Sequence, residues 1–110
     1  MKEEEKEEIY KEFHELVNMS PKEIEEWLKE DESKEVGQDS GDGESIGHKS
    51  GKKIIKIKRK KKAELTAANY EHMQKVNGYI KRHTAQRPGR SVKDTPWRYS
   101  LMNWGYDALK

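Results

Sequence analysis

The opposite charges of its two halves constrain this 110-residue chain more than any other feature of its sequence. Residues 1–48 carry 6 lysines and 17 acidic residues, a net charge of −11, whereas residues 49–110 carry 17 lysines and arginines and 4 acidic residues, a net charge of +13. Such an asymmetry predicts that the basic half meets a polyanion. The alternative is that the halves neutralise each other, within one fold or across a dimer.

The composition limits the chain to a small core. Hydrophobic residues make up 31% and charged residues 40% of the sequence, a balance that favours packed helices over a deep catalytic cleft. There is no cysteine, which excludes disulfides and thiolate metal sites. No apolar run approaches the roughly 20 residues of a membrane helix, and the acidic start MKEEEKEEIY is unlike a secretion signal. We therefore expect a soluble cytoplasmic protein without membrane contact, nucleoid-associated if its source is prokaryotic.

Helical periodicity predicts two helices in the acidic half. Over residues 3–18, one helical face is apolar and consists of Ile9, Phe13, Leu16 and Val17. The second helix has a clear start, because the N-cap candidate Ser20 is followed by proline and, three residues after the cap, by glutamate. The stretch that follows is polar and glycine-containing, which is typical of a flexible loop.

Three further helices are predicted in the basic half. Residues 45–62 have a helical pattern, although residues 55–58 also alternate like a strand. We favour the helix because lysine is a good helix former and no partner strand is apparent. Thr66 is placed to cap a helix over about 67–85, whose buried stripe is expected to be Tyr70, Met73, Val76 and Ile80. Asp94 or Thr95 caps a short C-terminal helix that begins at Pro96 and ends before Gly105. Tryptophans in that last helix must pack on the core or on a partner.

These elements predict one all-α domain over residues 1–110 with about five helices. An acidic helical pair (1–30) is followed by a flexible acidic loop (31–45) between helices 2 and 3. A basic helical part (46–110) ends in the tryptophan-containing helix.

A glycine-containing segment, SIGHKSGKKI at residues 45–54, resembles the hairpin of helix-hairpin-helix proteins. Ser45 stands where that family has its first glycine, and Gly51 stands at the family's small position. The resemblance implies that backbone amides and the next helix N-terminus grip a phosphate without reading bases. Exposed N–H groups and a helix dipole do attract anions. The alternative is that Gly47 and Gly51 allow close helix packing.

The residues 52–62 hold eight basic residues in eleven, which on duplex nucleic acid would neutralise phosphates. Other interpretations are a nuclear import signal, attachment to anionic membranes, or a solvated helix face. Trp97, Arg98, Tyr99 and Trp104 could stack on bases, although such aromatics more often belong to a core.

Catalytic and metal-binding motifs are missing from the sequence. The glycine segment has neither the spacing nor the Ser or Thr of a Walker loop. The histidines at positions 14, 48, 72 and 83 are scattered, without metal-ligand spacing. No Ser-His-Asp or paired-carboxylate arrangement is defensible. We therefore expect no enzymatic activity, no metal and no cofactor.

Four phrases spread over residues 9–109 resemble one protein family: EFHELVNMSPKEIEEWL, ESIGHKSGKKI, YEHMQKVNGYIKRHTAQRP and DTPWRYSLMNWG. It is a family of small prokaryotic and fungal proteins, catalogued as domain of unknown function 3140, with some members labelled DNA-binding. The resemblance implies a single domain with a structured C-terminal part, and it implies little about mechanism.

Together these features predict a non-enzymatic, largely sequence-neutral protein that binds nucleic acid, duplex DNA in the first place. The expected contacts are Gly47, Lys49, Gly51, Lys52, Lys53, Lys56, Arg59, Lys60, Lys81, Arg82 and Arg87. The acidic half could compete for this basic surface as an electrostatic gate. The alternative function is a protein-interaction or self-associating module, such as a homodimer, in which acidic and basic halves pair.

Overall fold

Side-chain caps decide where four of the helices begin. Ser20 accepts a hydrogen bond from the backbone N–H of the third helical residue, and Ser45, Thr66 and Thr95 do the same for three later helices. Each cap satisfies one of the backbone donors that have no partner inside a helix. The predicted caps at Ser20 and Thr66 are confirmed, and of the two candidates Asp94 and Thr95 it is Thr95 that caps the last helix. Ser45, which was matched to a glycine of the hairpin pattern, is instead the cap of a long helix.

The computed structural model describes residues 1–36 and 44–110, which contain six α-helices and no strand. The helices are α1 (Glu3–Leu16), α2 (Pro21–Leu28), α3 (Asp31–Glu35), α4 (Ile46–Arg59), α5 (Ala67–Thr84) and α6 (Pro96–Asn103), with a short 3₁₀ turn, η1 (Lys62–Glu64), before α5. The prediction of one all-α domain is confirmed. No helix in the described ranges is long and apolar enough to cross a membrane.

The predicted flexible loop over residues 31–45 is wrong for its first part. Residues 31–35 form α3, and the side chain of Ser33 in this helix is fully buried. The Ser33 hydroxyl and carbonyl both hydrogen-bond to the Asn103 side chain of α6. Sequence patterns predict a helix from regularly spaced apolar residues. The buried residue of α3 is a serine, so this helix has no apolar pattern by which it could be predicted. Residues 37–43 of the predicted loop lie outside the described part of the chain.

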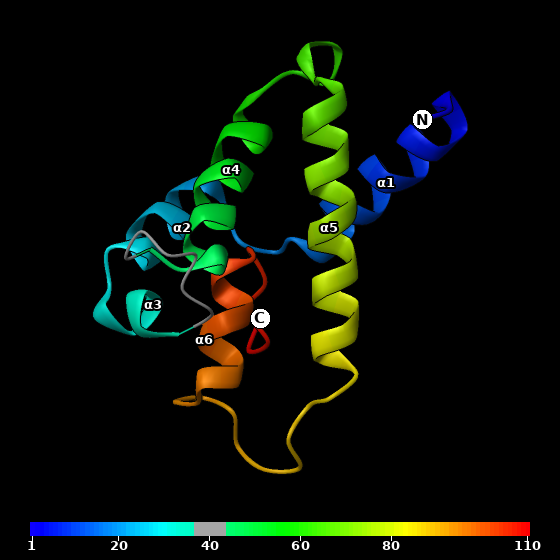
Figure 1. The fold of residues 1–110 in the computed structure, drawn as a ribbon. Helices are drawn as coiled ribbons and strands as arrows, with labels where there is room; N and C mark the ends of the chain where they lie inside the picture. Colours follow the sequence, from blue (N-terminus) through cyan, green and yellow to red (C-terminus); the bar gives the residue numbers. More distant parts are fainter. Residues whose placement is uncertain (37–43) are drawn as a thin grey trace.

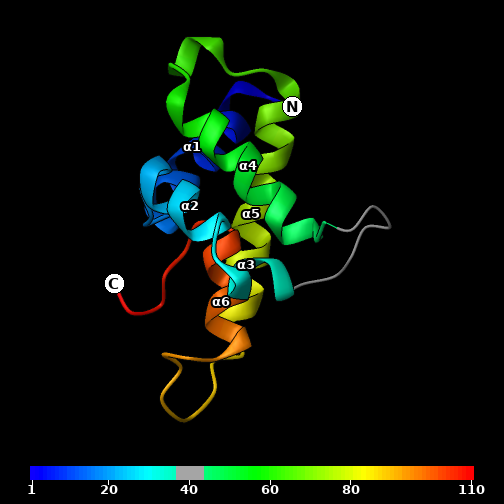
Figure 2. The ribbon, with the colours of Figure 1, turned by 90° about the vertical axis from the view of Figure 1, so that its left-hand side faces the viewer.

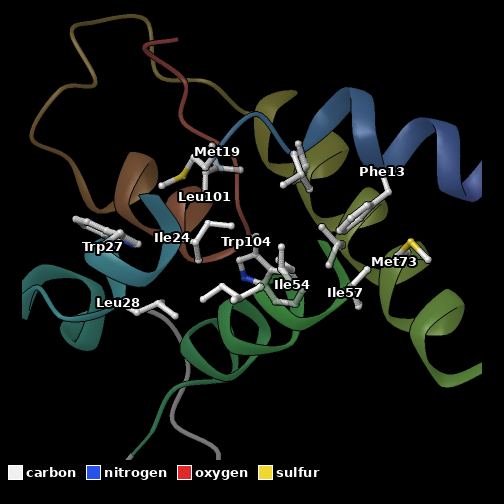
Figure 3. Packing of buried hydrophobic residues seen from close by; sticks show 14 of the residues in the cluster. Phe13, Met19, Ile24, Trp27, Leu28, Ile54, Ile57, Met73, Leu101 and Trp104 are labelled. Atoms are coloured by element: carbon white, nitrogen blue, oxygen red, sulfur yellow. The ribbon is translucent and has the colours of Figure 1, made fainter. Parts of the chain in front are cut away.

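The acidic helices supply half of the core on which the basic helices pack. Helix α1 lies against α5 and α2 against α4, while α6 contacts α2, α3, α4 and α5 (Figures 1 and 2). Apolar side chains from both halves meet in one cluster (Figure 3). Phe13 and Ile24 from the acidic half are fully buried there, as are Ile54, Met73 and Leu101 from the basic half.

Residues 55–58 continue α4 as a helix, which excludes the alternative that they form a strand.

Gly105 ends α6 and returns the chain to the α1–α2 connection. Its φ of +82° is a conformation that residues with a Cβ rarely adopt. Its carbonyl accepts a hydrogen bond from the Met19 N–H at 3.2 Å, and the Asn18 side chain bonds the backbone of Asp107 twice. The predicted glycine stop is confirmed, and the C-terminal residues are fastened to the acidic half.

Candidate nucleic-acid interface

The basic residues of α4 fall on different faces of the helix. Lys52 lies 2.5 Å from the Glu44 carboxylate, and Arg59 forms an ion pair with Glu25 of α2. A second set, spaced by four, three and four residues, projects together from another face because of the helical period. This set is Lys49, Lys53, Lys56 and Lys60, and all but Lys49 are classed as exposed. The fold therefore neutralises part of the basic run and presents the rest as a stripe.

Helix α5 divides its basic residues in the same way. Lys81 faces α1, where its Nζ lies 3.0 Å from the Glu12 carboxylate. Lys75, Tyr79 and Arg82, spaced by four and three residues, share another face that borders α4 and α6. Lys81, which was predicted to extend the basic patch next to Arg82, therefore points to a different side of the helix.

Two adjoining hollows lie where α4, α5 and α6 meet. The larger has a volume of about 380 Å³, and it includes Lys75 and Arg82 among its lining residues. The smaller, of about 80 Å³, is lined by Lys49 and Lys53 and shares Lys75 and Trp104 with the larger. In the described part of the chain, every charged residue that lines either hollow is a cation. We call Lys49, Lys53, Lys56, Lys60, Lys75 and Arg82 the cationic face.

A row of nearly parallel rings lies beneath this face and joins α5 to α6. The ring of Trp104 stacks on Tyr79 at 4.3 Å between centroids and on His72 at 6.1 Å. Tyr79 continues to His83 at 4.9 Å, and His83 to Trp97 at 6.2 Å, with interplanar angles of 13° to 15°. Trp104 is only 5% exposed. The ring faces are thus largely used against one another, as expected of core aromatics.

The site holds one histidine in its neutral form. The Nε2 atom of His72 lies 2.9 Å from the Ser50 hydroxyl of α4. Burial, and after it the nearby positive charges of Lys53 and Lys75, together lower the pKa of His72 from 6.5 to about 4. The positive charge of the site therefore comes from its lysines and arginine. Among the described residues, no three His, Asp or Glu side chains lie close enough together to hold a metal ion.

The two glycines of the hairpin-like segment lie inside α4 and pack against α6. A Cβ at Gly47 would stand 3.1 Å from the Trp104 indole nitrogen and 3.3 Å from the Asn103 Cβ. A Cβ at Gly51 would stand 2.9 Å from the Asn103 carbonyl oxygen. The segment is helical from Ile46 onward, so these glycines allow close helix packing, which is the alternative that the sequence left open. Their backbone is turned to α6 and not offered to a phosphate.

Of the predicted contacts, the structure brings Lys49, Lys53, Lys56, Lys60 and Arg82 onto one face. Lys52, Arg59 and Lys81 instead lie against carboxylates. The Arg87 guanidinium lies over the Trp97 ring, 5.6 Å from the ring centroid.

Lys75 and Tyr79 belong to the site and were missed from the sequence. Their signal was present, because both alternate with the buried stripe Met73, Val76 and Ile80 and share a helical face with Arg82.

Comparison with known proteins gives one match. A family model described as a protein of unknown function (DUF3140) matches residues 12–102, which is most of the chain and confirms the resemblance seen in the sequence. No curated protein and no solved structure matches the chain significantly.

Proposed function

Since the chain belongs to the DUF3140 family, which is described as of unknown function, we propose its role from the site itself: it is a non-enzymatic protein that binds nucleic acid through the cationic face. Duplex DNA is the first candidate ligand. Binding of this kind suits a cytoplasmic protein, associated with the nucleoid if the source is prokaryotic.

The observation that carries this proposal is how the fold sorts the charges. Carboxylates of the acidic half pair with basic residues that lie away from the cationic face, namely Arg59, Lys62, Lys81 and Lys110. By contrast, Lys53, Lys56, Lys75 and Arg82 form no ion pair with any described residue. Unpaired cations gathered on one side are what a polyanion requires, because each one can neutralise a phosphate and release a counterion.

The side chains of this face support binding without strong sequence preference. Five of its six cations are lysines, whose ammonium groups act as mobile point charges on phosphate. Contacts to phosphate position a protein on the duplex and carry no direct information about the bases. Arg82 is the one member able to contact a base edge with two parallel hydrogen bonds.

Self-association is the alternative function, and it requires acidic and basic halves of different copies to pair. In the described residues, α1 and α2 already pack on α5 and α4 of the same chain, and their ion pairs close within it. A dimer that dissolves at high salt and has no affinity for nucleic acid would favour this alternative over the proposed function.

The test is a salt titration of binding to a short random duplex, followed by fluorescence anisotropy. We expect log affinity to fall against log salt with a slope of about −4, as for four or five phosphate contacts. The variant Lys53→Glu with Lys75→Glu should lose binding. The matched control, Lys11→Glu with Lys22→Glu, changes two exposed lysines of α1 and α2 and has the same net charge. Equal loss in both variants, or no binding of the unmodified chain at about 50 mM salt, would overturn the proposal.

A further inference from the structure

Trp104 is a largely buried tryptophan whose indole N–H has no hydrogen-bond partner among the described residues. The other two indoles are satisfied, since the Trp27 N–H donates to Asn103 Oδ1 at 2.8 Å and the Trp97 N–H donates to the His83 carbonyl at 3.0 Å. Among the described residues nothing accepts from the Trp104 N–H, although the residue is 95% buried. The nitrogen itself is not enclosed, because the buried side-chain polar atom that lacks a partner in the described part of the chain is Asn77 Oδ1. The Trp104 N–H is therefore a donor that a ligand in the neighbouring cavity can reach.

The unpaired donor lies at the wall of the larger hollow. The Trp104 nitrogen stands 3.1 Å from the position that a Cβ on Gly47 would occupy, and both residues line the 380 Å³ cavity. Figure 3 shows the indole of Trp104 beside α4, close to Ile54. The missing Cβ at position 47 leaves space next to the indole nitrogen, so an acceptor atom can approach it from the cavity.

The other polar groups of this cavity also favour a negatively charged ligand. Lys75 and Arg82 flank it from α5. Ile46 and Gly47 are the first two residues of α4, at the positive end of that helix dipole. The Asn103 Oδ1 atom is already occupied by Trp27 and Ser33. Among the described residues, the lining of this cavity therefore offers cations and N–H donors and no carboxylate.

The remaining walls favour a ligand with a flat apolar body. Ile46, Tyr79 and Trp104 supply apolar surface beside the cations, and 380 Å³ lies within the range of small-molecule sites, about 300–1,000 Å³. We infer that this cavity binds one phosphorylated nucleotide, with its phosphate at Lys75, Arg82 and the Trp104 N–H and its nucleoside along Ile46 and Tyr79. The choice of a nucleotide rests on the proposed function, because the cavity opens on the cationic face.

The experiment follows the three indole N–H signals of the ¹⁵N-labelled chain by NMR in phosphate-free buffer, with Trp27→Phe and Trp97→Phe variants for assignment. Addition of adenosine monophosphate should move the Trp104 signal downfield and saturate, while the Trp27 signal stays in place. The variant Lys75→Gln with Arg82→Gln should weaken this response at least tenfold. Arg90→Gln with Lys93→Gln, two exposed residues between α5 and α6, is the control and should leave it unchanged.

Three outcomes would overturn the inference. These are a Trp104 signal that does not respond, a response that never saturates, and inorganic phosphate that binds as tightly as adenosine monophosphate, since the nucleoside walls would then contribute nothing.

A second titration distinguishes the two sources of such a ligand. A short single strand with a 5′-phosphate that saturates at lower concentration than the free nucleotide identifies a strand end, and the reverse order identifies the free nucleotide. The same strand with a 5′-hydroxyl is the control. Duplex binding without any nucleotide response would overturn this inference and leave the proposed function standing. A nucleotide response without duplex binding would overturn the proposed function and leave the nucleotide site standing.

Discussion

Gly51 of α4 lies so close to Asn103 of α6 that a Cβ at position 51 would stand 2.9 Å from the Asn103 carbonyl oxygen. The same Cβ would stand 2.9 Å from a methyl carbon of Leu28 in α2. Helix α4 is thus held against two other helices at a single residue. This contact sets the distance between α4 and α6, and with it the width of the cavity on the cationic face.

We expect Gly51→Ala to destabilise the protein by about 2 kcal/mol, because a clash with a backbone oxygen places the cost at the upper end of the range for overpacking. Overpacking of this kind costs about 1–3 kcal/mol, and the better helix propensity of alanine returns about 1 kcal/mol. Urea unfolding measures the difference. Gly89→Ala is the control, because a Cβ there has no neighbour within 4 Å, and its effect should be neutral or slightly stabilising. Wild-type stability of Gly51→Ala would mean that α4 and α6 are farther apart in solution.

Asn103 joins three helices through its side chain, and its loss should be more costly. It accepts hydrogen bonds from the Trp27 indole and the Ser33 hydroxyl, and it donates to the Ser33 carbonyl. Asn103→Ala leaves these three buried groups without partners, at about 1–3 kcal/mol for each unsatisfied group, so we expect a loss of at least about 3 kcal/mol. Hydrogen exchange should show that α3 loses protection first. Unchanged protection of α3 would refute its attachment through Asn103.

The free energy of unfolding should decrease when the pH is lowered and His72 becomes protonated. Its pKa of about 4 in the folded state lies below the ordinary value of 6.5, so the unfolded chain binds the proton first. This contribution is complete above pH 6.5 and is lost as the pH falls from 6.5 towards 4, at no more than about 1.4 kcal/mol per pKa unit. Unfolding of wild type and His72→Gln between pH 7 and 5 tests it. Burial also lowers the pKa of His14 and His83, and their contribution to the pH dependence is the same in wild type and in His72→Gln. Identical slopes of unfolding free energy against pH in the two proteins would therefore contradict the prediction.

Binding of a polyanion should raise the pKa of His72. Part of its depression comes from Lys53 and Lys75, and phosphates beside these lysines would offset their positive charge. NMR titration of the His72 ring protons with and without duplex DNA should show the shift. The ring of His14, which lies on α1, is the internal control and should titrate as before. Equal shifts of both rings would point to a general salt effect.

A test of the acidic half as an electrostatic gate must change its charges and keep its helices in place. Deletion of residues 1–35 would take Phe13, Ile24 and other buried side chains out of the core, so the chain should unfold. We expect Glu7→Gln, Glu12→Gln and Glu25→Gln together to tighten duplex binding at low salt only through the change in net charge, because Lys62, Lys81 and Arg59, which they release, lie away from the cationic face. Stability should change little, as usual for exposed ion pairs.

The matched control for the gate is Glu4→Gln, Glu5→Gln and Glu15→Gln, which changes the net charge equally at three exposed residues. We expect equal tightening by both triple variants. Clearly tighter binding of the first variant would show that the specific pairs gate the surface.

Local signals in the sequence determined most of the helices. The cap residues Ser20 and Thr66 predicted two helix starts correctly, and Asp94 or Thr95 predicted a third to within one residue, because capping involves atoms only three residues apart. The apolar stripe from Tyr70 to Ile80 predicted a buried face of α5, because the helical period alone brings those residues together. The charge split and the family resemblance were also visible without any structure.

Only the tertiary structure decided which basic residues face solvent together and what the glycines do. Lys52 and Lys53 are neighbours in sequence, yet one meets Glu44 while the other lines a hollow beside His72. The position of α6 turns Gly51 into a packing contact and brings Trp104 to the cavity wall. These outcomes depend on contacts between residues far apart in the chain, and the period of a single helix does not encode which other helix will cover each of its faces.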